Sequence, residues 1–233
     1  MIPFSDDVPA RRFPVVNVTL IAANFAVFLL YELPSGDAAI NQASFHPCDV
    51  TNTCRLGLPW GVSWITAMFM HAGWDHILGN MLFLAIFGKN VEDAFGRLGY
   101  LLFYVAGGFA ATMMQAAMTL YFGSASDAQI PTLGASGAIA AVLGAYFVLY
   151  PTSNVRTLML WFPVNIPAWI YLGGWFVYQF MEGRNALVHP TSSGGGGVAF
   201  FAHVGGFVFG VLVAGVLSGT GRVTAKRERW API

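Results

Sequence analysis

Long apolar segments alternate with short polar ones along most of the chain. A helix that crosses the roughly 30 Å core of a bilayer needs about 20 predominantly apolar residues. We therefore predict six membrane-spanning helices, over residues 15–33, 74–89, 98–122, 136–150, 166–181 and 199–217. Because the segment 136–150 is only about 22 Å long at 1.5 Å per residue, its first residue is expected to lie below the membrane surface, under a water-accessible cavity.

The composition agrees with this pattern. Hydrophobic residues make up 56% of the chain and charged residues 9%, whereas a soluble domain is about 25% charged. The formal net charge is zero and no basic tract is present, which argues against a nucleic-acid partner. We expect an all-α polytopic membrane protein, with an N-terminal tail over residues 1–14, a six-helix membrane domain over 15–217 and a basic C-terminal tail over 218–233.

Lysine and arginine residues are unevenly distributed between the two sides of this six-span arrangement. Of the 11, only Arg55 and Arg184 fall on one side. The others fall on the opposite side: Arg11, Arg12, Lys89, Arg97, Arg156, Arg222, Lys226, Arg227 and Arg229. The positive-inside rule therefore predicts that both termini are cytoplasmic. No small-residue cleavage site follows the first apolar segment, which we interpret as an uncleaved span rather than a signal peptide.

The loop between the first two spans carries both cysteines of the chain. Cys48 and Cys54 lie on the outer side, where an oxidising compartment permits a disulfide that closes a short loop. His46 makes a metal site the alternative, but three candidate ligands at irregular spacing are weak evidence for zinc. The pattern leaves the disulfide open, and we predict no metal site.

A serine stands among small residues at the start of the short fourth span, in the sequence Gly134-Ala135-Ser136-Gly137. These neighbours leave its backbone open to close approach by another molecule. Small residues are also typical of packing between membrane helices. The motif alone is compatible with either role.

Several polar side chains occur at membrane depth, where they are rare and point to a functional site. His71, His76 and Asn80 stand at the start of the second span, and the last two lie on one helix face because they are four residues apart. His203 stands near the start of the sixth span, which is otherwise apolar. The fourth and sixth spans both begin at the outer face, so Ser136 and His203 are expected at similar depth.

Glycines on the helix faces of these two residues favour their contact. Gly206 and Gly210 follow His203, and Gly144 follows Ser136 at helical period. Facing glycines let two helices approach closely, which would bring the hydroxyl within hydrogen-bond reach of the imidazole.

The combination predicts serine hydrolase chemistry. A serine hydroxyl becomes a good nucleophile when a base such as imidazole takes its proton. No acidic residue is evident near His203, so we expect a Ser136–His203 dyad rather than a triad. The side chains of Asn80 and His76 and the N–H of Ser136 are the candidate donors of an oxyanion hole.

At this point the sequence resembles the rhomboid family of intramembrane serine proteases. The family motifs occur in order, as His71-x4-His76-x3-Asn80, Gly134-x-Ser136-Gly137 and Ala202-His203-x2-Gly206-x3-Gly210. Each motif alone is weak, but their joint occurrence in a six-span frame is highly specific.

The resemblance implies particular roles for these residues. Ser136 is expected to be the nucleophile, His203 the general base, and His71 a structural residue. The implied substrates are transmembrane helices of other proteins in the lipid bilayer, cleaved near their outer ends. The fifth span and the loop Glu182 to Val198 look like a mobile gate and cap.

The sequence departs from the family pattern in two places. Some members carry a tyrosine that stacks on the histidine, where this chain has Ala140, so that another group must hold His203. The first loop also lacks the Trp-Arg pair of many members. Charged positions common in the family are matched by Glu92 and Arg97, which we interpret as structural.

Two other functions compete with proteolysis. An inactive relative could bind or chaperone transmembrane clients, but such relatives usually lose the serine or the histidine. A small transporter or channel would need inverted repeats or a polar track that reaches both faces, and neither is visible. We expect no cofactor, we interpret Trp161, Trp169 and Trp175 as an interfacial belt, and in the absence of a recognisable transit peptide we predict a bacterial inner membrane.

Overall fold

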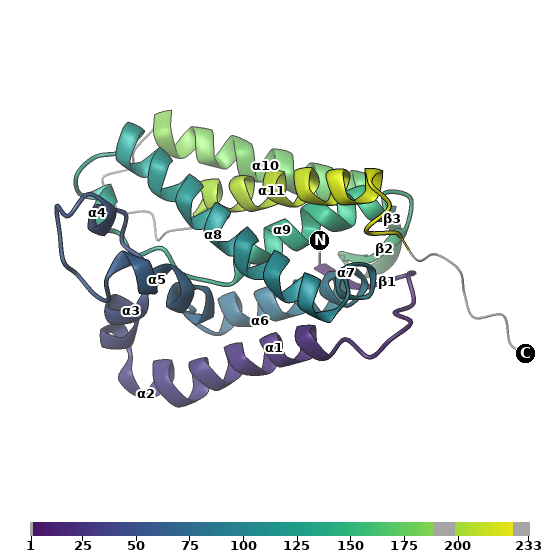
Figure 1. Cartoon of the computed structure of the whole chain (residues 1–233), viewed down its shortest axis with the longest axis horizontal. Coiled ribbons are helices and arrows are strands. Elements are labelled where there is room, and N and C mark those ends of the chain that lie inside the picture. Colours follow the sequence, from purple (N-terminus) through teal and green to yellow (C-terminus); the bar gives the residue numbers. More distant parts are fainter. Residues whose placement is uncertain (1, 189–198, 226–233) are drawn as a thin grey trace, which may run out of the picture.

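The computed structural model of the chain describes residues 2–188 and 199–225, in which long helices lie side by side in one bundle (Figure 1). Residues 189–198 of the predicted cap and 226–233 of the predicted basic tail lie outside the described residues. The helices are α1 (Val15–Val27), α2 (Leu33–Ser35), α3 (Asp37–Ala43), α4 (Pro47–Val50), α5 (Trp60–Thr66), α6 (Trp74–Phe83), α7 (Lys89–Phe95), α8 (Arg97–Phe122), α9 (Ser136–Leu149), α10 (Ala168–Val188) and α11 (Phe200–Gly219).

Short π-helical and 3-10 turns extend several of these helices. The π-helical turn η1 (Phe28–Glu32) joins α1 to α2, and η3 (Leu84–Gly88) joins α6 to α7. The 3-10 turns are η2 (Ala67–Phe69) and η4 (Asp127–Gln129). The prediction of a helical membrane bundle is confirmed, with the second predicted span running on through η3 into α7.

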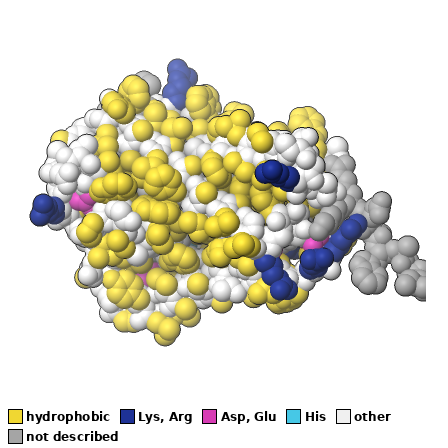
Figure 2. Space-filling view, in the orientation of Figure 1, with side chains coloured by type: hydrophobic (Ala, Val, Ile, Leu, Met, Phe, Trp, Pro, Cys, Tyr) yellow, Lys and Arg dark blue, Asp and Glu magenta, His cyan; other side chains and the backbone are white. Residues whose placement is uncertain are grey.

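Three helical segments of the described residues are long and apolar enough to cross a membrane, namely Val15–Ser35, Arg97–Phe122 and Phe200–Gly219. Hydrophobic side chains cover much of the face shown in Figure 2, and most of its Lys and Arg side chains gather toward the right-hand end, near α7. The exposed hydrophobic residues of the described chain include Leu30, Leu98 and Leu212, which expose 80%, 70% and 62% of their surface. Such a surface suits lipid as its surroundings.

The short helix α9 forms the centre of the bundle. It has 14 residues, or about 21 Å at 1.5 Å per residue, and every residue from Gly137 to Tyr146 is buried. An all-round apolar helix of this kind belongs inside a protein rather than against lipid. The structure thus places Ser136 at the end of a buried, recessed helix.

Helices α9 and α11 touch backbone to backbone. A Cβ atom added to Gly206 would overlap the carbonyl oxygen of Gly137, and one added to Gly210 would overlap that of Ala141. From the opposite side, a Cβ on Gly144 would overlap the carbonyl oxygen of Phe207. This close approach is the contact that the glycine spacing predicts.

A small sheet lies at the end of the predominantly helical bundle, near α7 (Figure 1). Strands β1 (Ile2–Asp6), β2 (Asn154–Met159) and β3 (Phe162–Pro167) pair antiparallel in the order β1-β2-β3. Part of the predicted N-terminal tail and most of the segment between the predicted spans 136–150 and 166–181 therefore form strands. Asp6 anchors β1, because its carboxylate lies 2.8 Å from Lys89 Nζ and accepts hydrogen bonds from Asn90 and from the Tyr146 hydroxyl.

Glu92 of α7 caps the first residues of α1. Its oxygens accept hydrogen bonds from the N–H groups of Val16 (3.1 Å) and Asn17 (2.7 Å). The N-cap residue Pro14 provides no side-chain acceptor, and the first N–H groups of a helix have no acceptor within it. A carboxylate at this position also interacts favourably with the positive end of the helix dipole. These two hydrogen bonds support the structural role that we inferred for Glu92.

The substitution Glu92→Gln is expected to lower the free energy of unfolding by about 1–3 kcal/mol, because an amide NH2 group would face a backbone donor in a buried site. Thermal unfolding in detergent measures the effect. Asp37, an exposed acidic residue at the start of α3, supplies the control Asp37→Asn. Equal midpoints for the two variants would contradict the capping role.

Candidate active site

The predicted nucleophile and base lie in direct contact. Ser136 is the first residue of α9 and His203 lies in the first turn of α11. The Ser136 Oγ is 2.7 Å from the His203 Nε2, across the close α9–α11 contact. The structure thus brings together two residues that are 67 positions apart in the sequence.

Gly134 shapes the backbone just before Ser136. Its φ of +117° lies in the region that favours glycine, and an added Cβ would stand 2.8 Å from His76 Nε2. Its N–H donates to the carbonyl oxygen of Ala67 at 2.8 Å, which fixes the loop against η2. A glycine is therefore required here both by conformation and by the neighbouring imidazole.

The candidate donors for an oxyanion lie on α6 and at the start of α9. The Ala72 N–H donates to His76 Nδ1 at 3.2 Å, so that the neutral ring carries its proton on Nε2, beside Gly134. Asn80 is buried one turn further along α6, and its Nδ2 has no hydrogen-bond partner within the described part of the chain. The Ser136 N–H adds a third donor because the first N–H groups of a helix lack an acceptor within it.

His71 packs against His76, one of these candidate donors. Its backbone N–H donates to both carboxylate oxygens of Glu32, at 2.9 Å each. The buried imidazole packs edge-on against His76 with ring centroids 5.1 Å apart. The contacts suit the structural role that the family resemblance implies for His71.

Two residues of α10 hold His203, and sequence reasoning missed both of these contacts. Gln179 Oε1 lies 2.7 Å from His203 Nδ1, and the Trp175 ring lies 5.7 Å from the imidazole between centroids. They take the place of an aromatic at Ala140, which is fully buried beside Gly206. A polar residue in a largely apolar span, four positions from a tryptophan, is the signal that could have found them.

The prediction that Trp161, Trp169 and Trp175 form an interfacial belt is therefore wrong for Trp175. Trp161 and Trp169 expose 86% and 54% of their surface, as a lipid or interface contact requires. Trp175 is half-buried against His203 instead.

The space beside Ser136 is small in this structure. Its volume is about 20 Å³, and its lining includes Met68, Leu133 and Ala199. That is room for about one water molecule. The described residues thus leave room for about one water molecule beside Ser136, whereas we predicted a water-accessible cavity above it.

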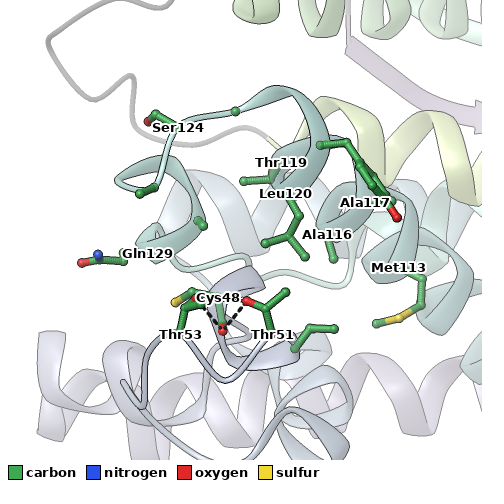
Figure 3. A pocket seen from close by; sticks show the side chains of 15 residues that line it. Cys48, Thr51, Thr53, Met113, Ala116, Ala117, Thr119, Leu120, Ser124 and Gln129 are labelled. Carbon is green, nitrogen blue, oxygen red and sulfur yellow. Dashed lines mark hydrogen bonds between the residues drawn. The ribbon is translucent and has the colours of Figure 1, made fainter.

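A larger cavity of about 780 Å³ lies elsewhere, between α4, the end of α8 and η4 (Figure 3). Its lining is mostly apolar and includes Cys48, Leu120 and the hydroxyl-bearing Thr51 and Thr53, both of which donate to the Cys48 carbonyl oxygen. It does not include Ser136, His203 or any other described residue that we predicted for the active site.

A disulfide joins Cys48 to Cys54 at the edge of this cavity, with 5.4 Å between their Cα atoms. The sulfur atoms lie near the Asp49 carboxylate, but a disulfide has no thiolate to bind a metal. His46 is buried with its Nδ1 3.9 Å from Asp49 Oδ2, and burial lowers the pKa of its imidazole. The arrangement favours the disulfide over the metal site.

Comparison with known proteins identifies the family of the chain. Residues 59–220 match the family model of the Rhomboid domain. The chain is 32% identical over 165 residues to Rhomboid-like protein 11, chloroplastic, of Arabidopsis thaliana, covering 69% of this chain and 54% of that protein. It is 28% identical over 200 residues to RHOMBOID-like protein 12, mitochondrial, of the same organism, covering 80% and 57%. It is 27% identical over 141 residues to the Putative rhomboid protease YdcA of Bacillus subtilis, covering 60% and 64%.

These relatives extend beyond the matched region, because the chain spans about half the length of the first two. Chloroplastic, mitochondrial and bacterial proteins share the likeness, which gives no support to a bacterial inner membrane over the other membranes. The apolar helices and the matched domain identify an integral membrane protein. The chain belongs to the rhomboid family.

Proposed function

We propose that the protein is an intramembrane serine endopeptidase that hydrolyses peptide bonds in or near transmembrane segments of other proteins. The observation that carries this proposal is the 2.7 Å hydrogen bond between Ser136 Oγ and His203 Nε2. It joins a potential nucleophile to a potential base inside an apolar bundle, where polar side chains are rare and point to function.

The reaction begins with attack of the Ser136 oxygen on the carbonyl carbon of the substrate, while His203 Nε2 takes the hydroxyl proton. The tetrahedral intermediate carries a negative oxygen, which the Ser136 N–H, His76 Nε2–H and Asn80 Nδ2 stabilise. The positive end of the α9 dipole acts on the same oxygen.

The intermediate then collapses and the C–N bond breaks. His203 returns its proton to the leaving amine, so that the C-terminal fragment departs and the N-terminal fragment stays as an ester on Ser136. A water molecule, deprotonated by His203, attacks this ester and releases the second fragment. The small space beside Ser136 has room for about one water molecule.

Two features favour proteolysis over an inactive relative. Both reacting groups are present and in contact, and the buried Asn80 Nδ2 has no partner among the described residues, which suits a donor that awaits an oxyanion. Two relatives from Bacillus subtilis carry the names Putative rhomboid protease YdcA and Rhomboid protease GluP. A transport pathway has less support, because the buried polar groups near α7, such as Asn17 and Glu92, are paired with one another instead of lining a channel.

A model single-span substrate in liposomes tests the proposal. We expect the wild-type protein to cut it within or near the transmembrane segment, with the bond located by mass spectrometry of both fragments. A wild-type protein that is folded but inert on a panel of such substrates would support the inactive, client-binding alternative instead.

Asn80→Ala is expected to lower kcat by about 10²–10³-fold while the protein stays folded, because one donor to the oxyanion is lost. Initial cleavage rates at saturating substrate measure the effect. The matched control is Asn41→Ala, since Asn41 is exposed on α3, and its rate should equal that of the wild type. If Asn80→Ala cuts as fast as Asn41→Ala, Asn80 has no part in the oxyanion hole.

A further inference from the structure

Gln179 is a buried amide on a helix whose other inward contacts near His203 are apolar. It exposes 6% of its surface, and its Oε1 lies 2.7 Å from His203 Nδ1. Burial of an amide is unfavourable unless it forms hydrogen bonds, and in a membrane-spanning helix such a residue marks function. The partner of Gln179 is the predicted base itself.

The identity of the atom that meets Nδ1 decides which nitrogen of His203 can act. A neutral imidazole has one N–H donor and one acceptor nitrogen. Because the amide oxygen of Gln179 can only accept, it requires the proton on Nδ1. Nε2 is then the acceptor, and it faces the Ser136 hydroxyl at 2.7 Å.

We infer that Gln179 is a positioning residue that holds His203 in the Nδ1–H tautomer and orients its Nε2 toward Ser136. The inference rests on the proposed function for its catalytic consequence. It extends the predicted dyad to a hydrogen-bonded set of three residues, Ser136, His203 and Gln179. A neutral amide takes the place that a carboxylate occupies in a serine protease triad.

The hydrogen bond also acts during the reaction. When Nε2 takes the serine proton, the Nδ1–H belongs to a cation, and hydrogen bonds from ionised donors are about twice as strong as neutral ones. The half-buried Trp175 ring, 5.7 Å away, lies within the distance at which an aromatic face stabilises a cation. The other imidazole of the site, His76 on α6, remains neutral in the proposed mechanism.

The tautomer can be measured without any substrate. In the full-length protein with ¹⁵N-labelled histidine, long-range proton–nitrogen spectra distinguish N–H from bare nitrogen, and the signals missing from His203→Ala assign this ring. At about pH 8, where imidazole is neutral, we expect Nδ1–H in the wild type and loss of this preference in Gln179→Met, which keeps the side-chain length without the acceptor. An Nε2–H signal in the wild type would overturn the inference.

Catalysis provides the second measurement. Gln179→Met is expected to lower kcat and the rate of Ser136 labelling by a fluorophosphonate about tenfold, with KM unchanged, as loss of one hydrogen bond predicts. Gln179→Glu keeps the acceptor and should keep the activity. Its negative charge favours the imidazolium, so the acid limb of the pH–rate profile should move to higher pH. A structural role alone would not produce this rescue and shift.

Gln129→Met is the matched control because Gln129 is exposed at η4, and it should match the wild type in rate and pH profile. If the wild type cuts but Gln179→Met retains its tautomer and rate, the positioning role is wrong and the proposed function stands. If the wild type reacts with neither substrate nor fluorophosphonate, while Gln179→Met alters the tautomer, the proposed function is wrong and the positioning role stands.

Discussion

Ser136→Ala and His203→Ala should each abolish cleavage of a transmembrane substrate, with kcat falling by about 10⁴- to 10⁶-fold as in other serine hydrolases. In the proposed reaction the hydroxyl supplies the atom that forms the acyl-enzyme, and the imidazole, 2.7 Å away, accepts its proton. Because the two groups act as one unit, the double variant should be no slower than either single one. Residual activity would come only from binding and from the oxyanion donors.

Cleavage in liposomes and labelling by a fluorophosphonate measure this effect independently of each other. Ser218, an exposed serine of α11, supplies the control Ser218→Ala, which should cut at the wild-type rate. Thermal unfolding checks that every variant is folded, and we expect a lower midpoint for His203→Ala, which leaves a cavity and removes the partner of the buried Gln179. If Ser136→Ala still cuts, the reaction does not pass through this hydroxyl and the proposed function is wrong.

The residues that the sequence predicted well are those that stand out from an apolar background. Ser136 and His203 each interrupt an apolar segment at the same end of its span, and glycines at helical period show which faces can meet. Length alone predicted that α9 is recessed, because its residues are too few to cross a bilayer. These features are local or periodic, and so they can be read from one chain.

The contacts that the sequence did not predict depend on how separate elements meet. Gln179 and Trp175 become partners of His203 only because α10 packs beside α11 at a particular rotation and depth. Strand β1 pairs with β2 although the paired residues, such as Ile2 with Leu158, are far apart in the sequence, and no turn motif links the two. The small space beside Ser136 is lined by residues of separate elements, among them Met68 and Leu133, and periodicity does not specify that they meet there.

The contact between α9 and α11 predicts a second large effect, at Gly206. Gly206→Ala should destabilise the folded protein by about 1–3 kcal/mol or more, because its Cβ would overlap the Gly137 carbonyl oxygen, and backbone cannot yield as a side chain can. Any separation of the helices also moves His203 from Ser136, and a displacement of about 1 Å can lower a rate by about 10²-fold. We therefore expect both a lower unfolding midpoint and slower cleavage.

Gly215 provides the matched control within the same helix, since a Cβ added there meets nothing within 4 Å. Gly215→Ala should leave cleavage unchanged and hold or slightly raise the unfolding midpoint, because alanine is favoured over glycine in a helix by about 1 kcal/mol. The two substitutions make the same chemical change and differ only in what the new methyl group meets. Equal stability and equal rates for Gly206→Ala and Gly215→Ala would therefore mean that α9 and α11 do not touch through their backbones, and the geometry of the Ser136–His203 pair would need another support.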